Sequence, residues 1–134
     1  MLNIGEAARQ GGVTVETLRY YERQGLIASP DRGRNGYRKY APEVVRRIRF
    51  IKRAQDVGFT LRDVGELLSL RADAGASCGD VRHRALGKLS EIEEKIEVLS
   101  RMRDVLGTWT AACPSTGPVD ACPILDALDG KDET

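Results

Sequence analysis

Three cysteines are the residues of this sequence whose types and spacing best suit a chemical role. Cys78, Cys113 and Cys122 are the only thiols in the chain. A thiolate is a soft, polarisable ligand that prefers soft metal ions to Mg²⁺ or Ca²⁺. The segment 113–122 carries a cysteine at each end and contains two prolines and a glycine, which hold the two sulfur atoms near each other at a small entropic cost. This pattern predicts a metal-binding loop.

Three thiolates without a fourth donor favour particular ions. Mercury(II) and lead(II) accept three sulfur ligands, whereas zinc usually completes a tetrahedron. The single histidine, His83, lies between Arg82 and Arg84, so we interpret it as part of a solvated helix face. We predict that the three cysteines bind a soft divalent metal ion, with mercury(II) as first choice and lead(II) or cadmium(II) as alternatives. The competing interpretation is three unrelated cysteines packed in the core.

Charge is distributed unevenly along the chain. Residues 1–71 hold 14 Lys and Arg and 8 Asp and Glu, a net charge of +6, whereas residues 72–134 hold 7 and 12, a net charge of −5. A basic front half and an acidic back half predict a polyanion-binding module joined to a second part. No apolar run could span a bilayer, and the first residues do not resemble a signal peptide, so we expect a cytoplasmic protein with no membrane partner.

The front of the chain carries the pattern of two short helices. Residues 3–11 have one apolar face, Gly11-Gly12 stops that helix, and Thr14 is the expected N-cap of a second helix ending at Gly25. This arrangement indicates a helix-turn-helix, the alternative being an ordinary helical hairpin. The second helix of a helix-turn-helix enters the major groove of DNA. The predicted DNA contacts from its exposed start are Thr14, Glu16, Thr17, Arg19 and Tyr20.

A basic hairpin is expected directly afterwards. Asn35-Gly36 is a strong turn sequence. The next four residues, Tyr37-Arg-Lys-Tyr40, are all basic or aromatic. Basic side chains on such a wing can reach phosphates while a tyrosine packs or donates a hydrogen bond. The predicted contacts are Arg34, Tyr37, Arg38 and Tyr40. The alternative is a solvated, charged hairpin without a ligand.

Three further helices are predicted, over residues 42–54, over residues 61–70, and from Gly79 to about residue 108. In the long helix, apolar residues alternate by four and three, which is a heptad seam. Little other apolar sequence is available to cover this seam, so we expect the same helix of a second chain to pair with it in a homodimer. The alternative is packing against its own domain. The predicted dimerisation residues are Leu89, Ile92, Ile96, Leu99 and Leu106.

The predicted fold is therefore mostly α. A winged helix-turn-helix DNA-binding domain (1–71) and a linker (72–78) precede a long coiled-coil dimerisation helix (79–110). The chain ends with a metal-binding loop, a short helix and a tail (111–134).

Four stretches of the front half resemble the MerR family of transcription regulators. They are Ile4-Gly-Glu-Ala-Ala8, Val15-Glu-Thr-Leu-Arg-Tyr-Tyr-Glu-Arg-Gln-Gly-Leu26, Gly36-Tyr-Arg-Lys-Tyr40 and Gly58-Phe-Thr-Leu61. The resemblance implies a winged helix-turn-helix, a long antiparallel coiled-coil dimerisation helix, and a twofold dimer on palindromic promoter DNA, where RNA polymerase also binds. It further implies repression without metal, and activation when metal binding bends and untwists the promoter.

The back half resembles the mercury-responsive branch of that family and its lead- and cadmium-responsive relatives. Copper- and gold-sensing members generally have Ser at the position of Cys78, and zinc-sensing members have an additional Cys beside Cys113 and a His in the loop. In the family, Cys78 of one subunit joins Cys113 and Cys122 of the other.

Two other classes of protein remain open. A metalloenzyme needs a carboxylate–histidine pair near the cysteines, and the sequence has none there, so we expect no enzymatic activity. A thiolate metal chaperone or scavenger would account for the back half alone, but it leaves the basic front half unexplained.

Overall fold

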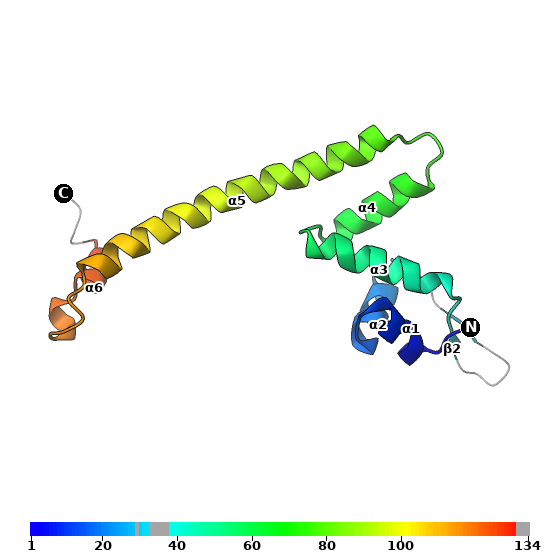
Figure 1. The fold of residues 1–134 in the computed structure, drawn as a ribbon, viewed down its shortest axis with the longest axis horizontal. Coiled ribbons are helices and arrows are strands. Elements are labelled where there is room, and N and C mark those ends of the chain that lie inside the picture. Colours follow the sequence, from blue (N-terminus) through cyan, green and yellow to red (C-terminus); the bar gives the residue numbers. More distant parts are fainter. Residues whose placement is uncertain (29, 33–37, 131–134) are drawn as a thin grey trace. The chain divides into compact units, whose positions relative to one another are not determined.

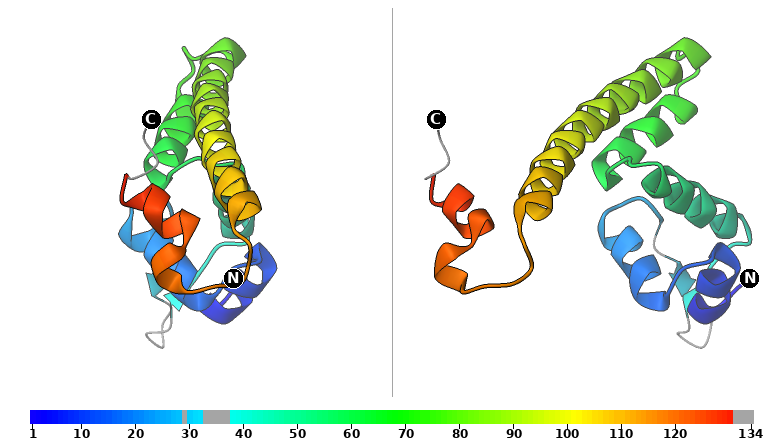
Figure 2. Two further views of the ribbon diagram at one scale, coloured as in Figure 1. Left: turned by 90° about the vertical axis from the view of Figure 1, so that its left-hand side faces the viewer. Right: turned by 60° about the vertical axis from the view of Figure 1, so that its left-hand side comes forward.

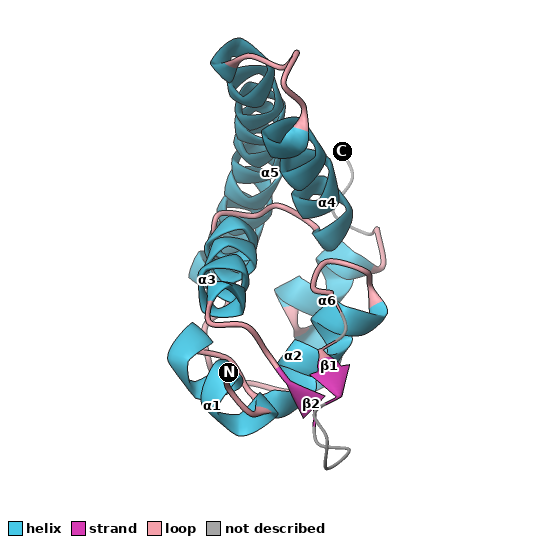
Figure 3. Cartoon of the chain, turned by 90° about the vertical axis from the view of Figure 1, so that its right-hand side faces the viewer, coloured by secondary structure: helices cyan, strands magenta, loops and turns pink. Residues whose placement is uncertain are grey.

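The fold was determined as a computed structural model, which describes residues 1–28, 30–32 and 38–130. The helices are α1 (Ile4–Gly11), α2 (Val15–Arg23), α3 (Glu43–Asp56), α4 (Leu61–Ala72), α5 (Cys78–Ala112) and α6 (Pro123–Leu128), with a 3₁₀ turn, η1 (Val119–Ala121). Two short strands, β1 (Asp31–Arg32) and β2 (Arg38–Lys39), pair antiparallel. Figure 3 shows that the secondary structure of the described chain is almost entirely helical, apart from the two short strands. The predicted mostly-α fold class is confirmed.

The chain divides into two compact units, Met1–Lys88 and Leu89–Thr134, and α5 contributes to both (Figure 1). The first unit therefore contains α1 to α4 and the first turns of α5. The division falls within the long helix. The domain limits expected from the sequence, at residues 71, 78 and 110, stay predictions.

Side-chain caps begin α2 and α4 of the first unit. Thr14 accepts a hydrogen bond from the backbone N–H of Thr17 at 3.1 Å and so caps α2. Thr60 and Asp63 form a reciprocal capping box at the start of α4, with N–H···O distances of 2.9 and 3.1 Å. Each cap satisfies backbone donors that the first helical turn leaves unpaired. Gly12 ends α1 in the left-handed region, at φ 78°.

The first unit has one hydrophobic core. α1 packs on α2 and α3, and α3 packs on α4, as the two views in Figure 2 also show. Two backbone hydrogen bonds join Leu2 and Tyr40, with N···O distances of 2.8 and 2.6 Å. They connect the start of the chain to the residue that follows β2. The core residues are Ala7, Ala8, Leu18, Tyr21, Leu26, Ile27, Tyr40, Ile48, Ile51, Ala54 and Val64.

The second unit contains most of α5, the loop after it, and α6. No residue of α5 is buried within the chain. Leu89, Ile96, Leu99 and Leu106 are each about half exposed or more, and Ile92 is intermediate. These are the residues of the predicted seam. No helix in the described ranges is long and apolar enough to cross a membrane.

Candidate DNA-binding surface and metal-binding cysteines

The exposed residues of α2 form one side of the helix. Leu18 and Tyr21 face the core, where both are almost fully buried. Glu16, Arg19 and Tyr20 are exposed, as is the cap residue Thr14. These predicted contact residues therefore remain accessible from outside the unit.

Three of the predicted contact residues, Thr14, Thr17 and Tyr20, also have partners within the chain. The hydroxyl of Thr17 lies 2.9 Å from that of Thr14, so Thr17 takes part in the cap. The guanidinium of Arg23 lies 5.7 Å from the centre of the Tyr20 ring, which orients that ring on the surface. The Thr14 cap thus fixes the first turn of α2, while the outer side of the helix stays exposed.

The wing is described in part. β1 and β2 place Asp31 opposite Lys39 and Arg32 opposite Arg38. Two predicted contact residues, Arg34 and Tyr37, lie outside the described residues.

Tyr40 has a different position from the one expected. Its side chain is 2% exposed, and its hydroxyl donates a hydrogen bond of 2.7 Å to Glu22 Oε1. A phosphate contact needs an accessible hydroxyl, so the structure corrects the prediction for this residue. The aromatic and basic residues of the wing predict contacts with phosphates, whereas Tyr40 lies where the wing returns to the core. Its burial anchors β2 on α2.

Two basic residues of α3, Arg49 and Lys52, bind the backbone at the end of α1, which the sequence analysis did not predict. Arg49 donates two hydrogen bonds, of 3.2 and 3.0 Å, to the backbone carbonyl of Gln10. Lys52 Nζ donates one of 2.8 Å to the carbonyl of Gly12. These cations satisfy carbonyl groups at the C-terminal end of α1, where the helix dipole also favours positive charge. Arg49 and Lys52 are three positions apart and therefore share one side of α3, and this spacing was the only feature of the sequence that indicated a common role.

Cys78 is the first residue of α5 and is exposed. Ser77 and Asp80 bracket it with reciprocal hydrogen bonds. The N–H of Ser77 donates to Asp80 Oδ2 at 2.8 Å, and the N–H of Asp80 donates to Ser77 Oγ at 3.3 Å. These bonds fix the first turn of α5, and with it the backbone of Cys78.

Cys113 and Cys122 lie at the two ends of the loop between α5 and α6, and both are half-buried. The N–H of Cys113 donates to Thr110 O at 3.3 Å, which continues the last turn of α5. Cys122 is the N-cap residue of α6, whose first position is Pro123. Ser115 and Gly117 adopt positive φ values of 66° and 106°, and they turn the loop back.

The three thiols are unpaired with one another. Among the described residues of a single chain, no three His, Cys, Asp or Glu side chains lie close enough together to hold a metal ion. Cys78 belongs to the first compact unit, and the other two cysteines belong to the second. Three free thiols nevertheless have the donor chemistry that a soft ion prefers.

The two short capped helices, with α2 exposed on its outer side and an antiparallel strand pair after it, define a helix-turn-helix protein. Two family models match its sequence. The model described as "MerR HTH family regulatory protein" matches residues 2–71, and the one described as "MerR, DNA binding" matches residues 45–109. The chain belongs to the MerR family of helix-turn-helix regulatory proteins.

Individual relatives match nearly the whole chain. The mercuric resistance operon regulatory protein of Bacillus cereus is 42% identical over 128 residues, which cover 96% of this chain and 97% of that protein. The HTH-type transcriptional regulator CueR of Salmonella typhi is 39% identical over 129 residues, which cover 96% of this chain and 93% of that protein.

Three solved structures have a similar fold. The regulator PbrR691 from Ralstonia metallidurans CH34, in complex with lead(II), gives a TM-score of 0.85 at 29% identity, with 96% of this chain and 99% of that chain covered. MerR from Bacillus megaterium MB1, in complex with mercury(II), gives 0.75 at 35% identity with the same coverage. An EcmrR–DNA complex gives 0.59 at 27% identity, with 81% of this chain and 40% of that chain covered.

Proposed function

We propose that the protein is a metal-responsive transcriptional regulator that represses a metal-resistance promoter without metal and activates it when a soft divalent ion binds. The observation that carries the proposal is the cysteine set. The three thiols are free, one begins α5, and two flank the loop that follows it. Relatives named for mercuric resistance, and similar proteins solved with mercury(II) and lead(II), support it.

The metal ligands in this proposal are Cys78 from one protomer and Cys113 and Cys122 from its partner. The exposed apolar side of α5 supports a homodimer, because water contact with so many large apolar side chains is costly and a second α5 would cover them.

Mercury(II) is the first choice of ion, since it accepts three sulfur ligands. Lead(II) and cadmium(II) are the alternatives. When bound, the ion supplies bonds that join the two protomers.

The DNA-binding role rests on the exposed side of α2 and on the wing. Arg19 is the best candidate for a base or phosphate contact, because it is charged, exposed and follows the capped first turn. The further proposed contacts are Thr14, Glu16, Thr17 and Tyr20 on α2, and Arg34, Tyr37 and Arg38 on the wing. The promoter DNA is palindromic and also carries RNA polymerase, and the protein works in the cytoplasm.

The proposed mechanism depends on two arrangements of the DNA-binding units in the dimer. A ligand shifts such an equilibrium only by its difference in affinity for the two arrangements. Because both protomers contribute cysteines to the proposed site, its affinity for the metal ion depends on the relative arrangement of the two protomers. In the arrangement that binds the ion, the two α2 helices hold the promoter bent and untwisted, so part of the specificity comes from deforming bases that no side chain contacts.

Footprinting and in vitro transcription test this proposal together. Purified protein is titrated with mercury(II), lead(II), cadmium(II) and zinc(II) in a thiol buffer, on DNA carrying the operator. We expect protection of the operator with and without metal, and hypersensitivity at its centre and transcription only with the ion that binds most tightly. Tight metal binding without any operator protection would instead support a metal chaperone or scavenger.

A further inference from the structure

Two ion pairs join α4 to the first turns of α5. Arg84 pairs with Glu66, and Lys88 Nζ lies 3.2 Å from Asp63 Oδ2. The two acids are three residues apart and the two bases four apart, so each pair of like residues shares one helix face. The later acid pairs with the earlier base, which means that α4 and α5 run antiparallel across the loop 73–77, as Figures 1 and 2 show.

The two pairs differ in their exposure to water. The side chains of Arg84 and Glu66 are 47% and 38% exposed, and ion pairs at such positions contribute little. The side chain of Lys88 is only 11% exposed. Its ammonium also lies 5.9 Å from the centre of the Phe59 ring, where a cation is attracted to the aromatic face. Lys88 is therefore the stronger of the two connections.

Asp63 is held in place before it meets Lys88. Its carboxylate accepts the N–H of Thr60 at 2.9 Å in the capping box of α4. This backbone hydrogen bond and the nearby Lys88 ammonium hold the pKa of Asp63 below its ordinary value, so the carboxylate stays charged at neutral pH. Lys88 thus binds a group that is fixed to the backbone at the start of α4.

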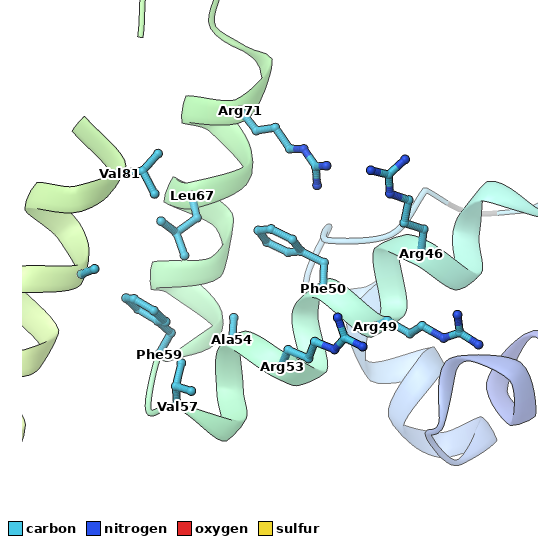
Figure 4. A pocket seen from close by; sticks show the side chains of 11 residues that line it. Arg46, Arg49, Phe50, Arg53, Ala54, Val57, Phe59, Leu67, Arg71 and Val81 are labelled. Carbon is cyan, nitrogen blue, oxygen red and sulfur yellow. The ribbon is translucent and has the colours of Figure 1, made fainter. Parts of the chain in front are cut away.

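Apolar packing between these elements is incomplete. An open pocket of about 760 Å³ lies between α3, α4 and the start of α5. Phe50, Phe59 and Leu67 line it from one side, and Val81 and Ala85 line it from α5. Figure 4 shows Phe59, Leu67 and Val81 around this space, with arginines along α3. No residue of α5 is buried, and the hydrophobic core of the first unit includes none of its residues. The polar connection therefore has a large share in setting the direction of α5.

We propose that Lys88 and Asp63 are positioning residues that couple the metal-binding start of α5 to the DNA-binding unit. The inference rests on the proposed function, in which Cys78 is a metal ligand. Cys78 and Lys88 are ten residues apart on one helix, about 15 Å along its axis, so they move as a rigid body. A displacement at Cys78 passes through Lys88 to α4, and then through the packing of α4 on α3, of α3 on α1 and of α1 on α2. The first compact unit ends at Lys88.

Three variants of the full-length dimer test the proposal. Lys88→Gln removes the charge and keeps most of the stem, whereas Lys88→Arg restores the ion pair. Arg82→Gln is the matched control, because Arg82 is an exposed residue of the same helix. The measurements are amide hydrogen exchange over residues 78–88, mercury(II) affinity by competition with a thiol buffer, and operator affinity without metal. The fourth is the mercury-dependent fluorescence of 2-aminopurine at the centre of the operator.

For Lys88→Gln we expect exchange over residues 78–88 to rise about fivefold and the mercury-dependent shift of the DNA equilibrium to fall by about the same factor. Mercury affinity and metal-free operator affinity should stay within about twofold of wild type. Lys88→Arg and Arg82→Gln should behave as wild type in all four measurements.

The coupling is overturned if wild type responds to mercury(II) and Lys88→Gln gives the same exchange and the same fluorescence change. A wild-type dimer that fails to bind mercury(II), or binds it without any fluorescence change, overturns the proposed function instead. In that case hydrogen exchange still tests whether the Lys88–Asp63 ion pair holds α5 on α4. No increase in exchange for Lys88→Gln contradicts this connection, and an increase relative to Arg82→Gln supports it.

Discussion

Gly11 offers a sharp test of how α1 packs against α3. A Cβ atom at this position would lie 2.5 Å from Ile48 Cγ2 and 2.8 Å from Ile48 Cβ. Carbon atoms pack best at about 3.5–4.0 Å, so Gly11→Ala creates a severe overlap. Ile48 is fully buried, and its Cβ is fixed by the backbone, so no rotamer change relieves the contact. The two helices must separate to accommodate the new methyl group.

The expected size of the effect follows from two opposing terms. Overpacking a well-filled core costs about 1–3 kcal/mol. Alanine is a better helix former than glycine by up to about 1 kcal/mol. The net loss should be roughly 1–2 kcal/mol, which lowers the urea midpoint by about 0.5–1 M for a protein of this size.

Equilibrium unfolding in urea, at one fixed dimer concentration and followed by circular dichroism, measures this loss. Gly65→Ala is the matched control within α4, because its Cβ would lie 3.7 Å from Leu26 Cδ2, an ordinary contact distance. The control should raise the midpoint through its helix propensity. A midpoint for Gly11→Ala equal to or above that of Gly65→Ala would refute the described packing of α1 on α3.

Two further substitutions test the core and the DNA-binding surface. Tyr21 donates a hydrogen bond of 2.7 Å to Gln55, and burial, together with the charge of Asp56, raises the pKa of Tyr21 above its ordinary value. The stability that its neutral phenol contributes is therefore complete below about pH 10 and is lost as the pH rises through the raised pKa. Tyr21→Phe should cost about 1 kcal/mol at pH 7 and remove this part of the alkaline decline in urea midpoints; equal declines would contradict the assignment. Arg19→Ala should weaken operator binding about tenfold in gel-shift titrations while mercury(II) binding persists, and unchanged operator affinity would exclude Arg19 as a contact.

Local chemistry allowed much of the first unit to be predicted. Thr14 caps α2 as expected, and Thr60 caps α4 in the same way, since both hydroxyls satisfy backbone donors only three residues away. Gly12 likewise ends α1. These features are readable from sequence because each involves residues a few positions apart.

Features that depend on distant residues were harder to predict. The burial of Tyr40 against Glu22, and the bonds from Arg49 and Lys52 to the end of α1, exist only once the unit has folded. Aromatic and basic residue types alone do not distinguish such tasks from contacts with DNA.

The end of α5 lies beyond the expected end at about residue 108. The helix continues to Ala112 through a segment with two threonines, which are weak helix formers. Thr108 and Thr110 donate their hydroxyls to the carbonyls of Asp104 and Leu106 at 3.0 and 2.8 Å. These local bonds satisfy the hydroxyls inside the helix. The helix therefore reaches the residue before Cys113.

In the proposed function the three cysteines converge only when a second chain is present, so a single protomer would not contain the site. Their residue types and spacing predict the ligand set, and the sharing between protomers stays a prediction. Mixed dimers can distinguish a metal site shared between the two protomers from a metal site formed within one chain.

The most direct measurement is the number of mercury(II) ions bound by a mixed dimer. One protomer carries Cys78→Ser, and its partner carries both Cys113→Ser and Cys122→Ser. A shared site keeps Cys78 of the second protomer with Cys113 and Cys122 of the first, so we predict one tightly bound ion with three-sulfur coordination for each mixed dimer. Neither parental homodimer retains such a site. A mixed dimer that binds no ion more tightly than the parental homodimers would contradict the account.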